Sequence, residues 1–148
     1  MNIKNQGPAF YCNVLAAILG IAGVILTIVS STMTVDNALP NITVLAVAGI
    51  IGVILVAVAA YLPNRRGNSD LISAAAVLGA IALYMYTLGG AAIQRVMLIA
   101  GLFSYNANNT AGWNIFYVSV AAWVCLLVGI VFLIIGSFLN SVKERKAA

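Results

Sequence analysis

The sequence predicts an all-α integral membrane protein, and three observations support this fold class. Of the 148 residues, 64% are hydrophobic and only 7% are charged, whereas soluble domains carry about 25% charged residues. Four long apolar stretches alternate with short polar segments, and the charged residues lie between or beyond these stretches. Because each stretch can cross ~30 Å of hydrocarbon as a helix, we expect one domain, residues 1–148, folded as a four-helix transmembrane bundle.

The first two spans are expected at residues 9–31 and 42–62. Pro8 suits the first turn of a helix, where its missing N–H would have had no partner. Pro40 and Asn41 end the following turn, and Asn41 is a suitable capping residue for the second span. Cys12 in the first span and Cys125 in the last do not lie in loops, so the sequence indicates no disulfide framework.

The third span is expected at residues 71–90, because twenty residues cover about one hydrocarbon thickness. Gly89-Gly90 then predicts a break or bend. Residues 91–104 follow as a short outer amphipathic segment, apolar except for a narrow edge of Gln94 and Arg95. This segment could lie flat at the interface, with Arg95 reaching the headgroups, or pack back on the bundle. A fifth crossing is the rival interpretation, but 14 residues with an arginine are too short for it.

A polar loop, residues 105–112, leads to the fourth span at residues 113–139. With the N-terminus inside, six of the seven basic residues face the cytoplasm and only Arg95 lies outside. The six are Lys4, Arg65, Arg66, Lys143, Arg145 and Lys146. This bias predicts that both termini are cytoplasmic.

Each predicted span carries a stripe of small residues, which lets helix backbones approach closely in lipid. We expect one glycine of each stripe to lie at a helix–helix contact: Gly20, Gly52, Gly79 and Gly129. The stripes favour a compact bundle with antiparallel neighbours, although they could also dock on another protein.

Several aromatic residues fall near the expected outer end: Tyr84, Tyr86, Tyr105, Trp113 and Tyr117. An aromatic belt at the membrane interface explains them. The alternative interpretation is that these residues form the entrance of a binding site for an apolar or cationic ligand.

The sequence contains few residues that could carry out catalysis or proton transport. It has no histidine, and its three acidic residues, Asp36, Asp70 and Glu144, lie at span ends or in the tail. Proton-coupled carriers need ionisable groups within their spans, and hydrolases need a base or a metal site. No base lies near Cys125 in sequence, so we interpret it as a packing residue. We therefore expect no enzyme activity, no catalytic residue, no cofactor, no metal and no nucleic-acid partner.

By elimination, we expect an accessory or structural subunit of a larger membrane complex, or a homo-oligomer. Arg95, Met97 and Phe103 in the outer segment are the expected partner contacts. The alternative is a small transporter or channel for a small solute, not proton-coupled through a buried carboxylate. With such short loops, we expect the cytoplasmic membrane of a bacterium, with the lipid bilayer as the solvent.

Overall fold

The structure, a computed structural model, describes residues 6–63 and 71–140 and forms four helices within them. These are α1 (Pro8–Thr32), α2 (Ile42–Tyr61), α4 (Leu71–Ser104) and α5 (Thr110–Ser137). All four are long and apolar enough to cross a membrane. The predicted all-α, four-helix membrane fold is therefore confirmed. The basic residues that predict orientation, apart from Arg95, lie outside the described residues.

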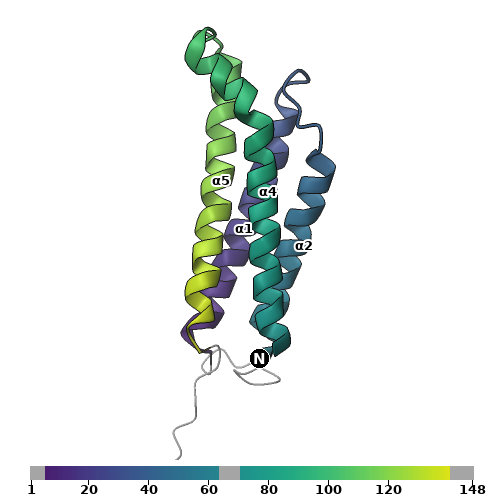
Figure 1. Ribbon diagram of the computed structural model, residues 1–148. Helices are drawn as coiled ribbons and strands as arrows, with labels where there is room; N and C mark the ends of the chain where they lie inside the picture. The colour runs from purple at the N-terminus through teal and green to yellow at the C-terminus, as the bar shows by residue number, and fades with distance from the viewer. Residues whose placement is uncertain (1–5, 64–70, 141–148) are drawn as a thin grey trace, which may run out of the picture.

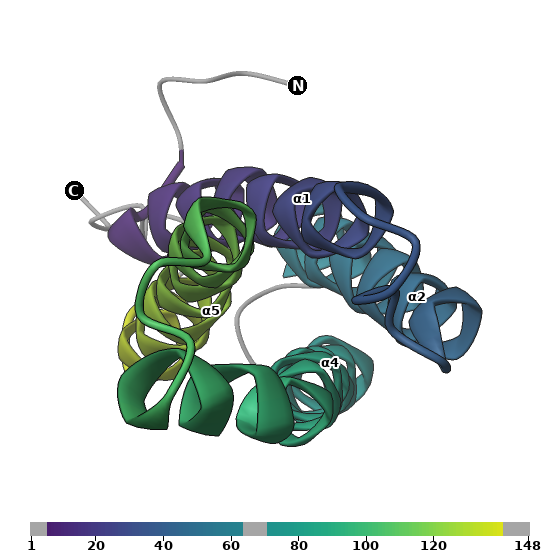
Figure 2. The same ribbon diagram turned by 90° about the horizontal axis from the view of Figure 1, so that it is seen from above.

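The helices form an up-down-up-down bundle (Figure 1). Seen from above, they stand in the order α1, α2, α4, α5, and each helix packs on its two neighbours (Figure 2). α1 and α4 stand at opposite corners and barely touch. The start of α1 meets the end of α5, where the Ala9 amide donates to the Asn140 carbonyl. We call this end of the bundle the inner end and the opposite one the outer end.

Local sequence explains the starts of α1 and α5. Pro8 opens α1 in its first turn, as predicted. Asn41 occupies the N-cap position of α2, but its side chain makes no capping hydrogen bond. Asn109 caps α5, because its side-chain oxygen accepts from the Gly112 amide at 2.9 Å. That bond satisfies one of the amides that have no partner within the first turn.

The expected break in the third span is wrong. α4 runs without interruption through Gly89-Gly90 for 34 residues, so residues 91–104 are its outer part and not a separate helix. Two facts explain the continuity. A break at membrane depth would leave backbone groups without partners, and a Cβ at Gly90 would lie 2.6 Å from Leu45 Cδ2, so this glycine serves close packing on α2. The last turns of α4 lean over toward α5 (Figure 1, Figure 2).

Tyr84 lies at the centre of the bundle. It is 0% exposed, and around it pack buried residues of all four helices: Ala16, Val56, Ala80, Leu126, Ile130 and Leu133. The expectation that Tyr84 belongs to an outer aromatic belt is therefore wrong. Its ring instead fills the space that small residues leave between the helices.

Candidate functional site

Three of the predicted packing glycines surround Tyr84 from three different helices. A Cβ at Gly20 of α1 would overlap the Tyr84 hydroxyl, and a Cβ at Gly52 of α2 would lie 2.8 Å from its ring. At Gly129 of α5 the nearest ring atom is 3.6 Å away. The fourth glycine, Gly79, faces Leu55 of α2 at 3.0 Å. The glycines around Tyr84 thus form a slot that accepts one tyrosine.

The Tyr84 side chain reaches across the bundle from α4 to α1. Its hydroxyl donates to the Ala16 carbonyl at 3.4 Å. A buried hydroxyl in an apolar interior needs such a partner. The phenol therefore joins α4 to α1, and it fills the middle of the bundle.

Arg95 lies inside the outer end of the bundle and not at its surface. It is 3% exposed. Its guanidinium donates to the Ser30 carbonyl at 2.7 Å, to the Ser30 hydroxyl at 3.4 Å and to the Asn37 carbonyl. Ser30 belongs to the last turn of α1, whose carbonyls have no partner within the helix and carry the negative end of the helix dipole. The arginine therefore caps α1 and holds the following loop.

The neighbouring residue, Gln94, has the complementary role at the start of α2. Its side-chain oxygen accepts from the Asn41 amide at 3.3 Å, while its nitrogen donates to the Gly90 carbonyl at 3.2 Å. Two consecutive residues of α4 thus hold both ends of the α1–α2 loop. We call Gln94, Arg95, Ser30, Asn37 and Asn41 the Arg95 cluster.

The three residues expected to contact a partner differ in exposure: two of them are exposed and one is buried. Met97 and Phe103 are 81% and 66% exposed on the outer part of α4. Arg95 is buried in its cluster, so it is not presented to a partner on that surface. The expectation that it reaches lipid headgroups is also wrong, because the α1 and loop carbonyls bind it instead.

An aromatic cluster fixes the outer part of α4 to α5. The Phe103 ring lies edge-on to Trp113, with centroids 5.1 Å apart, and to Phe116 at 6.0 Å. Trp113 stacks on Tyr117 at 6.0 Å. Such pairs contribute about 0.5–1.5 kcal/mol each beyond area burial. They explain why the end of α4 leans on α5 instead of extending freely.

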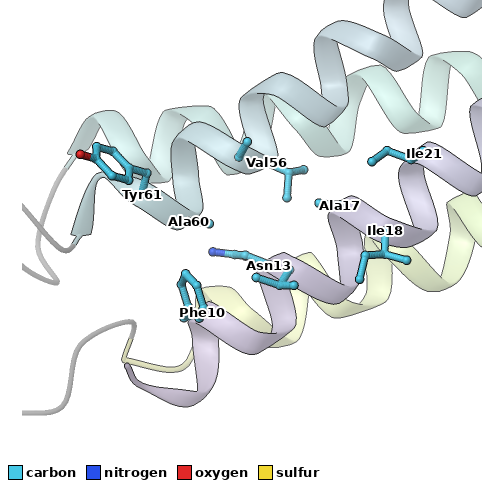
Figure 3. A pocket seen from close by; sticks show the side chains of 10 residues that line it. Phe10, Asn13, Ala17, Ile18, Ile21, Val56, Ala60 and Tyr61 are labelled. Atoms are coloured by element: carbon cyan, nitrogen blue, oxygen red, sulfur yellow. The ribbon is translucent and has the colours of Figure 1, made fainter. Parts of the chain in front are cut away.

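Two hollows lie at opposite ends of the molecule. The outer pocket, of about 270 Å³, has a partly polar lining of loop and α4 residues: Asn37, Met97, Leu98, Gly101, Leu102, Tyr105, Asn106 and Asn109. The inner groove, of about 300 Å³, lies between α1 and α2 and is almost wholly apolar (Figure 3). Tyr84 and its slot lie deeper in the bundle, at the level of the groove's far end, where Val56 both lines the groove and packs with Tyr84.

Sequence reasoning missed the central position of Tyr84 and the cluster role of Arg95, although a signal for both was present. The buried face of α4 contains Ala76, Ala80, Tyr84, Thr87, Ala91 and Arg95, spaced three or four residues apart. That spacing marks one face of a continuous helix. The assumed break at Gly89-Gly90 hid the second half of this pattern.

The described residues hold no group of three or more His, Cys, Asp or Glu side chains that could bind a metal ion. Cys12 and Cys125 are free and half-buried. Comparison with known proteins found no matching family model, no matching curated protein and no matching solved structure. The geometry of this chain is therefore the basis on which a function can be inferred.

Proposed function

We propose that this protein is a non-enzymatic accessory or structural subunit of a larger membrane complex, or the repeating unit of a homo-oligomer. The observation that carries the proposal is the closed centre of the bundle. Tyr84 fills the slot made by Gly20, Gly52 and Gly129, and its hydroxyl is bonded to α1. An interior filled in this way supports a packing role more than a solute pathway.

The outer part of α4 supports the same proposal by offering a contact surface. At about 1.5 Å per residue, the 34 residues of α4 span about 51 Å, well beyond ~30 Å of hydrocarbon. On this outer part Ile93, Met97 and Phe103 are exposed. An apolar face held rigid at the membrane interface is suited to another membrane protein. We call Ile93, Val96, Met97 and Phe103 the outer α4 face.

A transporter or channel for a small solute is the second candidate, and the outer pocket favours it. This pocket combines three asparagine residues, Asn37, Asn106 and Asn109, with an apolar wall. A solute entering there would next meet the Arg95 cluster and then Tyr84. Transport would therefore require Tyr84 to leave its slot, which makes this the less supported candidate.

We further propose a bacterial cytoplasmic membrane with both termini in the cytoplasm. The inner end holds the start of α1 and the end of α5 together, and Arg95 lies at the outer end. The remaining basic residues adjoin the inner end in sequence, in agreement with the positive-inside rule.

A membrane-impermeant maleimide tests this orientation on intact cells, with Cys12 and Cys125 replaced by alanine. It should label Val35→Cys, at a position 94% exposed in the outer loop, and not a cysteine placed in the tail. The reverse labelling would refute the orientation.

Affinity purification from native membranes in mild detergent, followed by native mass measurement, tests the subunit proposal. We expect a stoichiometric second chain or a defined homo-oligomer, and we expect Met97→Asp to remove it. Val35→Asp is the matched control, because it adds the same charge at an exposed apolar position of the outer end. A lone monomer, or equal effects of the two substitutions, would contradict the proposal.

A further inference from the structure

The inner groove has an apolar wall on each side and a single buried amide in its floor. α1 contributes Phe10, Val14, Ala17, Ile18 and Ile21, and α2 contributes Val56, Ala57, Ala60 and Tyr61. Figure 3 shows the Asn13 side chain reaching from α1 into the space between Phe10 and Ala60. At about 300 Å³, the groove lies at the small end of the range for ligand pockets.

The length of the groove matches one leaflet of a bilayer. From Phe10 to Ile21 the α1 wall rises about 16 Å, and half of the hydrocarbon thickness is about 15 Å. The groove thus begins at the inner interface and ends near the midplane. A partner's transmembrane helix would need a track through both leaflets and room for a cylinder about 10 Å wide. An acyl chain of one leaflet needs neither.

Asn13 adds a second, independent indication of a ligand. Asn13 is 5% exposed, its side-chain nitrogen points into the groove (Figure 3), and no hydrogen bond to another described residue engages this nitrogen. An amide carries two donors and an acceptor, and leaving them without partners in an apolar medium is unfavourable. Asn13 lies only five residues after Pro8, about 8 Å along the helix. That level is close to the boundary where the ester groups of phospholipids lie.

The groove is also continuous with the lipid-facing surface of the bundle. Ile18 and Ile21 line its wall and are at the same time exposed at the outside of α1. A lipid can therefore enter sideways from the bilayer without any rearrangement of the helices. The neighbouring lipid of that leaflet is the occupant that this geometry favours over a water-soluble ligand.

We propose that the inner groove binds one acyl chain of a phospholipid from the inner-end leaflet, and that the Asn13 amide donates to the ester carbonyl of this chain. The site is separate from the outer α4 face and does not depend on the proposed subunit function. It makes the lipid a specific ligand at one position of the bundle surface.

Native mass spectrometry of the purified full chain with added dioleoyl phosphatidylglycerol tests the site. Ala57→Phe places a ring in the groove from an exposed position, so the bundle needs no repacking. Ala75→Phe is the matched control, because Ala75 is exposed on α4 at a similar distance from the inner end and does not line the groove. We expect Ala57→Phe to lower the fraction of chains carrying one lipid at least about fivefold, and Ala75→Phe to leave it unchanged. Equal occupancy in both variants would overturn the proposal.

A diether phospholipid with the same headgroup and chains tests the contact with Asn13, because it lacks the ester carbonyls. Wild-type protein should bind the diester about fivefold more tightly than the diether, which is the change that loss of one ordinary hydrogen bond produces. Asn13→Leu, which keeps the size of the side chain, should bind both lipids equally. Equal binding of both lipids by the wild type would refute the assigned contact. A dimer that Ala57→Phe dissociates would show a second copy in the groove instead and would overturn the lipid proposal.

Discussion

At the scale of single residues, Tyr84 occupies the centre of the bundle and packs among buried residues of all four helices. Gly20, Gly52 and Gly129 leave space at its level, and the Tyr84 ring fills that space. In lipid, helices gain little from the hydrophobic effect on meeting, so close packing and buried hydrogen bonds hold them together. A tyrosine supplies both, through its ring and through its bond to the Ala16 carbonyl. The slot and the tyrosine therefore depend on each other.

This dependence predicts the effect of Gly20→Ala. The new methyl group would overlap the Tyr84 hydroxyl and the ring carbon that bears it, so we expect a loss of about 1–3 kcal/mol in the free energy of unfolding. Thermal unfolding in detergent measures the effect as a lower Tm. Gly20→Ala combined with Tyr84→Phe should recover part of the loss, because the hydroxyl is then absent.

Gly89→Ala is the matched control for Gly20→Ala, because nothing lies within 4 Å of a Cβ at that position. Replacing a helical glycine by alanine there should raise stability by up to about 1 kcal/mol. Equal destabilisation by Gly20→Ala and Gly89→Ala would show that the slot around Tyr84 is not tightly packed.

Arg95 gives a second prediction at this scale. Arg95→Met keeps an apolar stem of similar reach but leaves the Ser30 and Asn37 carbonyls without their donor. Hydrogen bonds to charged groups contribute about 1.5–3 kcal/mol, so we expect a clear fall in Tm. Arg95→Lys keeps a cation near the end of α1 but loses the planar fork, so its Tm should fall between those of Arg95→Met and the wild type. A Tm for Arg95→Met equal to that of the wild type would remove the assigned capping role.

At the scale of elements, α4 organises the outer end. Its residues Gln94 and Arg95 hold the α1–α2 loop, and Phe103 packs on α5. One helix thus fastens both of its neighbours at the outer end of the bundle. This arrangement requires that α4 be continuous, since a hinge at Gly89-Gly90 would release the outer contacts together.

Spin-label distances test the continuity of α4, with the native cysteines replaced. Leu78 and Met97 are both exposed and are 19 residues apart, so labels at these positions should give a narrow distribution near about 28 Å. Ile72 and Tyr86, also exposed, lie before the two glycines and should give about 21 Å as the control pair. A broad or much shorter distance for the outer pair alone would reveal a hinge.

The elements also show how far sequence reasoning reaches. Apolar length and the short polar turns predict the four helices and the starts of α2 and α4 at Ile42 and Leu71, because the bilayer imposes a minimum helix length. They do not show whether the helix breaks at Gly89-Gly90 or continues through these two residues. A glycine pair is compatible with a break or with close packing, and only the position of Leu45 on α2 distinguishes the two. The buried position of Arg95 could not be predicted as long as residues 71–90 and 91–104 were treated as separate segments.

The same limit applies to the hollows. Asn13 is the only residue with a side-chain amide within residues 9–31 of the sequence. Whether this side chain points into a groove depends on how α1 and α2 are placed relative to each other. The groove lies between α1 and α2, while each of these helices packs more extensively on another partner, α1 on α5 and α2 on α4. The groove is therefore a property of the assembled bundle that no single helix encodes.

At the scale of the whole molecule, the bundle combines a closed centre with two distinct surfaces. Tyr84 closes the interior, the outer α4 face presents Met97 and Phe103, and the inner groove presents Asn13 to the opposite leaflet. The described part of the protein consists almost wholly of helices that can span a membrane, so a partner would have to contact it largely within the membrane or at its interface. These features together support the proposed role as a subunit.

Photo-crosslinking in native membranes tests this role most directly. A benzoylphenylalanine at Met97 should give one discrete protein adduct, either with a second membrane protein or with another copy of this chain. The same residue at Val124, which is exposed on the membrane-spanning part of α5, should give none. No protein adduct at Met97, or the same adducts from both positions, would contradict the assignment of the outer α4 face as the docking surface.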